Sequence, residues 1–185
     1  TGRQSRRLIN NEQYKETIPT SSESNLKIKF FDLRFGNLCN LKCRMCSPAN
    51  SNQIAKEITE INNKEYSKFY PVFDIDTDEW WETDTFDDNI KSQVDNIDTI
   101  YMTGGEPTVI EKNFEILRDL IELDKSKHIT LIINTNLTNT NPRFYQYLPN
   151  FKSVILQLSI DGYEKVQEYL RYPSKFKQID ESIHK

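Results

Sequence analysis

Residues 28–48 read IKFFDLRFGNLCNLKCRMCSP. The stretch opens with an Ile- and Phe-rich run, which predicts a short buried strand over residues 28–35. The only three cysteines of the chain, Cys39, Cys43 and Cys46, follow directly after Gly36. Ligands of parallel α/β proteins bind at the carboxyl ends of the strands. This stretch therefore predicts an α/β protein with a metal-binding loop after its first strand.

The chemistry of three thiolates on one tight loop leaves several alternatives open. They can hold one metal centre, but that centre remains one ligand short. A four-iron cluster held by three cysteines would keep one iron open to a small molecule, whereas zinc would need His128, His184 or a carboxylate as its fourth ligand. His128 precedes the third predicted strand, at the opposite end of the sheet from the loop, and His184 lies at the end of the chain. The positions therefore favour an iron–sulfur cluster over zinc or over three purely structural cysteines.

The rest of the chain repeats a strand–helix rhythm. Three more short apolar runs predict strands over residues 97–102, 129–133 and 154–160, and their composition is typical of strands covered on both faces. Apolar residues at helical spacing follow each predicted strand, at Ile54, Ala55, Ile58 and Ile61, at Ile110, Phe114, Leu117 and Ile121, at Phe144, Tyr147 and Leu148, and at Val166, Tyr169 and Leu170. Four such units predict parallel α/β architecture, either open or closed into part of a barrel.

Two segments stand outside this rhythm. Residues 1–24 are polar and predict an extension ahead of a core over residues 25–185. Residues 65–95 form an acidic stretch, with eight carboxylates between Asp74 and Asp88 around Trp80 and Trp81, and we expect a solvated insertion whose tryptophans pack it onto the core. An acidic, aromatic surface for a partner is the alternative. A calcium loop is disfavoured because the carboxylates lack the glycine-punctuated spacing of such a loop.

Glycines and polar residues follow the predicted strands. Gly36 follows the first strand, Gly104 and Gly105 the second and Gly162 the fourth, and glycine is used where backbone must turn sharply or approach a ligand. Because parallel strands end at the same edge of a sheet, four segments should meet on one rim. These are the cysteine loop, residues 104–107, residues 134–136 and residues 159–162.

Composition excludes several classes of protein. The 185 residues are 36% hydrophobic and 28% charged, with a formal net charge of −4. These values describe a soluble, slightly acidic protein and argue against nucleic-acid binding by bulk charge. No apolar run approaches the roughly 18–20 residues of a membrane span, and the first twenty residues lack the core of a secretory signal. Three close cysteines do not suggest a disulfide framework, so we expect a reduced, cytoplasmic environment.

The sequence resembles the radical S-adenosylmethionine (radical SAM) enzymes. Cys39-x3-Cys43-x2-Cys46 after the first strand, together with Gly-Gly-Glu-Pro at residues 104–107 after the second, is the paired signature of that family. The resemblance runs from about residue 27 to residue 185 and is closest to members with a C-terminal SPASM or twitch extension. It implies a partial (β/α)6 barrel of parallel strands with the first four βα units present. The chain also begins at Thr1 rather than Met and ends within a predicted helix, so we expect a fragment.

The resemblance also implies the roles of individual residues. Cys39, Cys43 and Cys46 would ligate a [4Fe-4S] cluster, whose open iron would take the amino and carboxylate groups of SAM. The loop of Gly104, Gly105, Glu106 and Pro107 would orient the methionine amino group, and Arg171 would bind the carboxylate. Ser159 and Asp161 would lie near the ribose, and Asn134, on the same rim, is expected to belong to the cofactor-binding residues as well. Met45 stands where many members place an aromatic residue near adenine, and its thioether can still cover a ring.

The implied activity follows from the cofactor. An external donor such as flavodoxin or ferredoxin would supply one electron, SAM would be cleaved to methionine and a 5′-deoxyadenosyl radical, and the radical would abstract hydrogen from a substrate. That substrate could be a peptide or protein side chain, or a small metabolite, and a glycyl-radical activating enzyme is a third possibility. A catalytically silent cluster-binding scaffold and a zinc-stabilised domain remain as alternatives to an enzyme.

Overall fold

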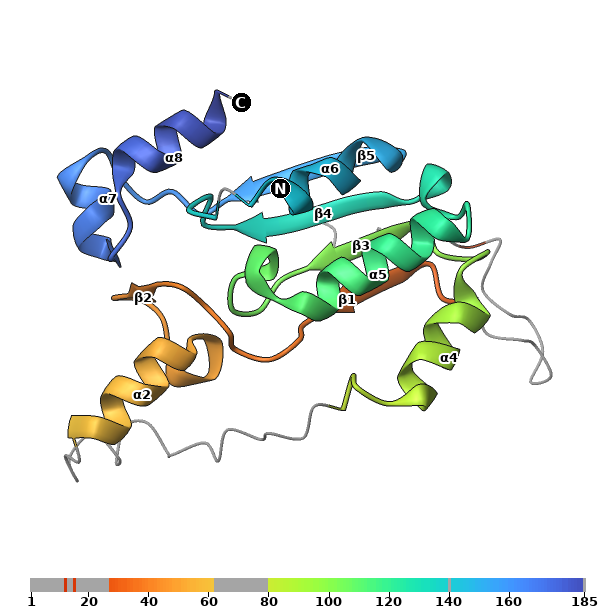
Figure 1. Cartoon of the computed structure of the whole chain (residues 1–185), viewed down its shortest axis with the longest axis horizontal. Coiled ribbons are helices and arrows are strands. Elements are labelled where there is room, and N and C mark those ends of the chain that lie inside the picture. Colours follow the sequence, from red (N-terminus) through yellow and green to blue (C-terminus); the bar gives the residue numbers. More distant parts are fainter. Residues whose placement is uncertain (1–11, 13–14, 16–26, 62–79, 140, 185) are drawn as a thin grey trace.

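The centre of the computed structural model is a parallel sheet of four strands, and the structure describes residues 12, 15, 27–61, 80–139 and 141–184 (Figure 1). The strands are β1 (Phe30–Leu33), β3 (Thr99–Met102), β4 (Thr130–Thr135) and β5 (Ser153–Leu158). They lie in the order β1-β3-β4-β5, and each strand is parallel to its neighbours. The predicted α/β class and its four parallel strands are confirmed.

Helices connect the strands at the predicted places. They are α2 (Asn52–Ile61), α5 (Glu111–Glu122), α6 (Pro142–Tyr147) and α7 (Lys165–Leu170), and α8 (Phe176–Ile183) follows at the end of the described chain. Asn141 caps α6 by accepting a hydrogen bond from the backbone N–H of Arg143. Single 3-10 turns lie at Pro48–Asn50, Pro107–Val109, Ser126–His128 and Leu148–Asn150. None of the described helices is long and apolar enough to cross a membrane.

Three further elements, one helix and two short strands, were not predicted. Helix α4 (Asp84–Gln93) forms in the acidic insertion, where the Thr83 side chain accepts from the backbone N–H of Phe86. Strand β2 (Lys42–Cys43) lies inside the cysteine loop and pairs in antiparallel fashion with β6 (Arg171–Tyr172). The polar extension, apart from residues 12 and 15, and residues 65–79 of the insertion lie outside the described residues, so the predicted domain boundaries stay a prediction.

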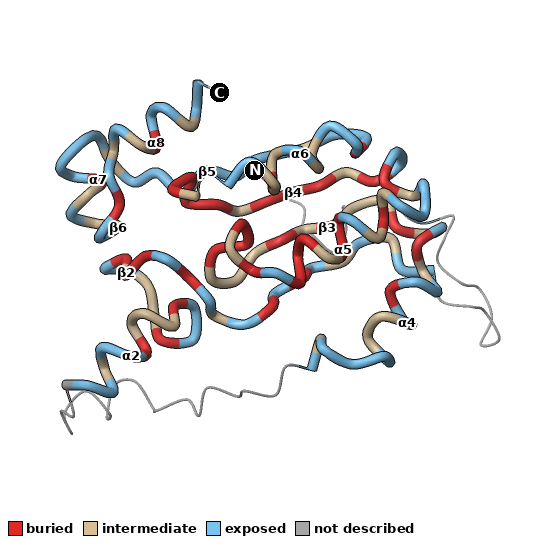
Figure 2. The backbone as a smooth tube through the Cα atoms, in the orientation of Figure 1, coloured by how far each residue is buried: buried red, intermediate tan, exposed pale blue. Residues whose placement is uncertain are grey.

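One face of the sheet carries the hydrophobic core. Along β3 and β4 every second residue is buried, and Figure 2 shows both strands in the colours of buried and intermediate residues. Helices α4, α5 and α6 cover this face and contribute to the same cluster as the strands. Its fully buried members include Ile97, Ile100, Met102, Leu117, Leu120, Ile129, Leu131, Ile133 and Phe144.

The other face is more open than the sequence predicts. Strands covered on both faces were expected, but the alternate residues of β3 and β4 are only partly buried, and Ile155 on β5 is 49% exposed. The difference arises because all the helices that join the core cluster lie on one side of the sheet, among the described residues. The open face carries Tyr101, Ile132 and Asn134, which alternate with buried neighbours.

The tryptophan pair packs against the end of β1. The ring centroids of Trp81 and Phe35 are 5.7 Å apart, and those of Trp80 and Phe35 are 6.1 Å apart. Trp81 also lies against Gly36, where an added Cβ would meet the indole ring at 3.2 Å. The described part of the insertion is therefore attached to the core through its aromatic residues, next to the start of the cysteine loop.

Candidate active site at the carboxyl ends of the strands

The loop after β3 fits directly against the cysteine loop. The backbone N–H of Glu106 donates to the carbonyl of Leu38 at 2.8 Å. Gly105 approaches so closely that an added Cβ would lie 2.1 Å from the Leu38 oxygen, and its φ of +37° is one that side-chain-bearing residues rarely adopt. Only glycine fits at this contact. The two segments predicted to share a rim therefore meet backbone to backbone.

The carboxylate of Glu106 ties this loop to the end of β4. Its Oε1 accepts from the hydroxyls of Thr108 and Thr135 at 2.6 and 2.7 Å and from the Thr108 N–H at 3.2 Å. Its Oε2 accepts from the Asn136 N–H at 2.7 Å. The residue is 1% exposed. Four internal donors thus occupy a side chain that the family resemblance had placed near the methionine amino group.

A second set of hydrogen bonds connects the cysteine loop with the loop after β4. The Asn136 amide donates to Asn40 Oδ1 at 2.9 Å, and the Asn40 amide donates to the Thr138 hydroxyl at 2.8 Å. Asn136 Oδ1 accepts from the Thr138 hydroxyl at 2.6 Å. Asn40 received no role from sequence reasoning, because its partners lie almost a hundred residues away. Its position between Cys39 and Cys43 in the sequence was the one signal that could have identified it as a residue of the site.

The three cysteines gather at this junction. Cys39 and Cys43, each 8% exposed, form a small cluster with Leu41, and Cys46 packs against it. All three are free thiols. The Leu41 N–H points to Cys39 Sγ at 3.5 Å, as donors around thiolate ligands of iron–sulfur clusters do. The donor set, three thiols on one loop with a backbone donor beside Cys39, fits a [4Fe-4S] cluster.

Burial controls the protonation of two of these thiols. Desolvation raises the pKa of Cys39 to about 11, against a smaller opposing effect of the Leu41 N–H. Desolvation also raises the pKa of Cys43, and the nearby positive charge of Arg171 opposes that rise. Both thiols are therefore protonated at neutral pH in the metal-free protein. Because thiolates are the ligands of metals, cluster binding must release these protons.

The geometry does not favour a single-ion zinc site. Among the described residues, no three His, Cys, Asp or Glu side chains are arranged to hold one metal ion. His128 Nε2 lies 3.2 Å from the Val94 carbonyl at the amino end of β4, away from the cysteine loop, as the sequence predicts. His184 Nδ1 contacts the Asp180 carbonyl at the end of α8. Neither histidine reaches the cysteines.

The segment after β5 closes the rim. Ser159 donates its N–H to the Thr135 carbonyl at 2.9 Å, which places it beside the end of β4. Arg171 Nε donates to Asp161 Oδ2 at 2.5 Å, and Arg171 Nη1 lies 3.9 Å from Cys43 Sγ. Asn134, by contrast, lies on the open face of β4 in register with Gln157. The segment after β5 thus adjoins the end of β4 through Ser159 and reaches the cysteine loop through the contact of Asp161 with Arg171.

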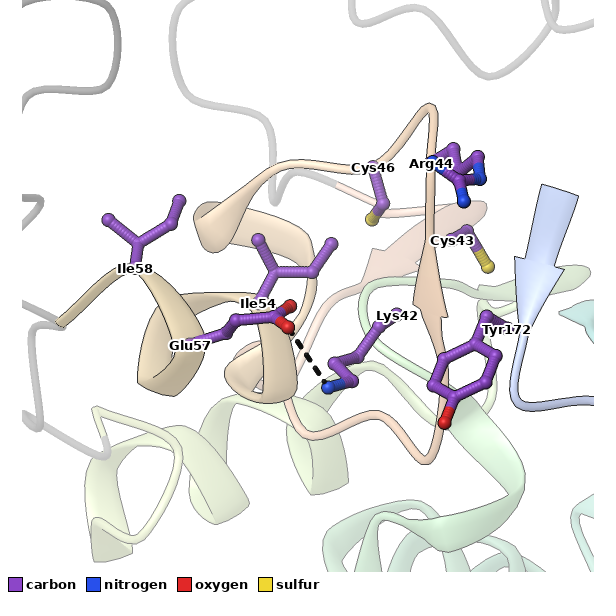
Figure 3. Close-up of a pocket in the computed structure, with 8 residues that line it drawn as sticks. All are labelled: Lys42, Cys43, Arg44, Cys46, Ile54, Glu57, Ile58 and Tyr172. Atoms are coloured by element: carbon purple, nitrogen blue, oxygen red, sulfur yellow. Dashed lines mark hydrogen bonds and ion pairs between the residues drawn. The ribbon is translucent and has the colours of Figure 1, made fainter. Parts of the chain in front are cut away.

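A pocket of about 420 Å³ borders the cysteine loop on the side of α2 (Figure 3). Its lining is Lys42, Cys43, Arg44, Cys46, Ile54, Glu57, Ile58 and Tyr172, and Figure 3 shows Lys42 paired with Glu57 at 3.3 Å. Gly104, Glu106 and Ser159 are absent from this lining. The pocket therefore lies beside the rim rather than on it. Met45, on the same loop, is 55% exposed.

Comparison with known proteins decides the family. The model of the radical SAM superfamily matches residues 33–185, which include every segment of the rim. The chain belongs to the radical SAM superfamily. Members of this superfamily use a [4Fe-4S] cluster and SAM, so the two predicted cofactors are confirmed as those of the family. Membership implies SAM-dependent radical chemistry, for which a reductant and a substrate are needed.

One curated radical SAM relative is a GTP 3′,8-cyclase from Alkaliphilus oremlandii (strain OhILAs). It is 25% identical over 154 residues, which are 83% of this chain and 38% of the cyclase. The chain thus spans about two fifths of the length of this relative. No solved structure matches the chain with significant similarity.

Proposed function

We propose that this chain is the cluster- and SAM-binding part of a radical SAM enzyme, with Cys39, Cys43 and Cys46 as the ligands of one [4Fe-4S] cluster. The observation that carries the proposal is that these three thiols lie together, half-enclosed, where the loops after β1 and β3 meet. When bound and reduced, this pair of cofactors supplies a 5′-deoxyadenosyl radical for hydrogen abstraction from a substrate.

Different residues of the rim would bind different groups of SAM. The guanidinium of Arg171 is the fixed cation nearest to Cys43 and suits the SAM carboxylate. Gly104 and Gly105 would offer backbone carbonyls to the ammonium group, and Pro107 begins the 3-10 turn that follows them. Glu106 would act differently from the family expectation, because its buried carboxylate accepts from Thr135 and so would hold this turn against β4.

The remaining assignments rest on the family pattern. Ser159 and Asp161 would face the ribose, since both lie on the segment that follows β5. Met45 would cover the adenine, because its exposed thioether projects from the cysteine loop. Asn134 would face the substrate from the open face of the sheet rather than SAM.

The substrate class is the least constrained part of the proposal. A GTP 3′,8-cyclase resembles this chain, but the match covers only part of that protein. The predicted likeness to members with a SPASM or twitch extension makes a peptide or protein side chain the first substrate to test, and a small metabolite the second. A flavodoxin or ferredoxin would supply the electron.

The test is anaerobic reconstitution with iron and sulfide, followed by low-temperature EPR of the dithionite-reduced protein with and without SAM. We expect one four-iron cluster per chain, a reduced signal that changes when SAM is added, and 5′-deoxyadenosine after incubation. Cys43→Ala should lose the cluster, whereas Met45→Leu, a matched change on the same loop, should keep it.

Three outcomes would overturn the proposal. A cluster whose signal ignores SAM, with no 5′-deoxyadenosine, would leave a silent scaffold as the better description. Stoichiometric zinc in place of iron in protein purified without oxygen, or a Cys43→Ala variant with an unchanged cluster, would remove the ligand assignment.

A further inference from the structure

An ion pair lies against one of the cluster ligands. Arg171 Nη1–H donates to Cys43 Sγ at 3.9 Å, and the same guanidinium donates through Nε to Asp161 Oδ2 at 2.5 Å. The Arg171 side chain is only 17% exposed. A positive charge with a negative partner is thus held within contact distance of the Cys43 thiol.

The backbone fixes Arg171 in this position. Cys43 and Arg171 are paired residues of the β2–β6 ladder, so their Cα atoms stand opposite each other. The neighbouring Arg44 N–H donates to the Leu170 carbonyl at 2.8 Å, which adds a second main-chain bond beside the ladder. The contact between guanidinium and sulfur therefore follows from main-chain pairing and not from a freely moving side chain.

Asp161 is held just as firmly. Its backbone N–H donates to Gln167 Oε1 at 2.8 Å, and the Gln167 amide donates to the Ser159 carbonyl at 3.3 Å. Gln167 is completely buried. An internal glutamine thus fixes the turn that carries Asp161, and the carboxylate remains beside Arg171.

We propose that Arg171 raises the reduction potential of the cluster bound at Cys43, and that Asp161 is a positioning residue that limits this effect by sharing the guanidinium. The inference rests on the proposed function, because it needs the three cysteines to hold the cluster. Reduction adds one negative charge, so a cation that donates to a ligand sulfur stabilises the reduced form more than the oxidised form. A carboxylate paired with that cation acts in the opposite direction.

This role is compatible with binding of the SAM carboxylate by the same side chain. The guanidinium fork has five N–H donors, and the contacts to Asp161 and Cys43 use Nε and Nη1. One residue can therefore position a carboxylate ligand and act on the sulfur of Cys43. Because the two roles overlap, the test must be carried out without SAM.

The experiment is an EPR-monitored redox titration of the reconstituted 185-residue chain, reduced with dithionite in the absence of SAM. We expect Arg171→Gln to lower the midpoint potential and Asp161→Asn to raise it. In the Arg171→Gln background the effect of Asp161→Asn should shrink, since Asp161 acts through Arg171. Arg44→Gln is the matched control: it removes the same charge one residue from Cys43, but its guanidinium stacks on Tyr169, 3.9 Å from the ring centroid.

The results separate this inference from the proposed function. Wild-type protein that takes up no iron would mean that the proposed function fails. A wild-type cluster whose potential does not fall in Arg171→Gln, or falls equally in Arg44→Gln, would overturn the inference and leave the function intact. If Arg171→Gln loses the cluster, the test rests on Asp161→Asn. A midpoint potential that stays constant or falls in Asp161→Asn would then contradict the proposal.

Discussion

Replacement of Glu106 by alanine tests whether the rim is held together by one buried carboxylate. The side chain accepts four hydrogen bonds and is 1% exposed. Alanine would leave the backbone N–H groups of Thr108 and Asn136 without an acceptor. The hydroxyls of Thr108 and Thr135, by contrast, can rotate toward other acceptors. An unsatisfied buried donor costs about 1–3 kcal/mol, so the variant should lose about 2–6 kcal/mol of folding free energy.

Glu106→Gln should lie between the wild type and alanine. The amide oxygen can replace Oε1 and keep the donors of Thr108 and Thr135, but the amide nitrogen would then face the N–H of Asn136. One unsatisfied donor corresponds to a loss of about 1–3 kcal/mol. The expected order of stability is therefore wild type, then glutamine, then alanine.

Urea unfolding of the metal-free protein measures these losses without any contribution from the cluster. For a chain of this size, the loss in Glu106→Ala corresponds to a fall in Tm of roughly 4–24 °C. Glu122→Ala is the control, because the same substitution at this exposed position of α5 should change stability by less than about 0.5 kcal/mol. A Glu106→Ala variant as stable as Glu122→Ala would refute the reasoning.

Three further predictions concern the cysteine loop. Gly105→Ala should destabilise the metal-free protein and prevent cluster assembly, because the new Cβ would lie 2.1 Å from the Leu38 oxygen; thermal unfolding and iron content check this, and normal values for both would contradict it. Cys46→Ser should abolish the visible iron–sulfur absorption while leaving far-UV circular dichroism unchanged, since Cys46 is the least buried of the three thiols. Alkylation of Cys39 by iodoacetamide in the metal-free protein should be about a hundredfold faster at pH 9 than at pH 7, because a pKa raised to about 11 keeps the reactive thiolate scarce at both pH values. Peptide mapping measures that rate, and a rate that levels off below pH 9 would show that burial does not suppress the thiolate.

Much of the fold could be predicted because its signals are local. Each strand is a short apolar run, and parallel strands end at one edge of a sheet. The strand order alone therefore predicted that residues 104–107, 134–136 and 159–162 lie on one rim. Helix α4 was overlooked because its acidic composition concealed the spacing of Phe86, Ile90 and Val94, although Thr83 offered a capping signal.

The contacts that organise the rim could not be predicted in the same way. Glu106 meets Thr135 and Asn136 across about thirty residues, and Cys43 meets Arg171 across 128. Neither hydrophobic periodicity nor composition indicates which hydrogen-bond donors will surround a buried acidic side chain. The motif predicted that Glu106 is needed, and only the geometry shows that its carboxylate faces the protein interior.

The packing of the indole rings beside Gly36 has a practical consequence. Trp80 and Trp81 are the only tryptophans of the chain, and both lie against Phe35, four residues before Cys39. Iron–sulfur clusters absorb broadly in the near ultraviolet, so a cluster held at this loop should quench the intrinsic emission of both rings by energy transfer. The protein thus contains its own optical reporter, with which cluster assembly and loss can be followed in real time without any added label.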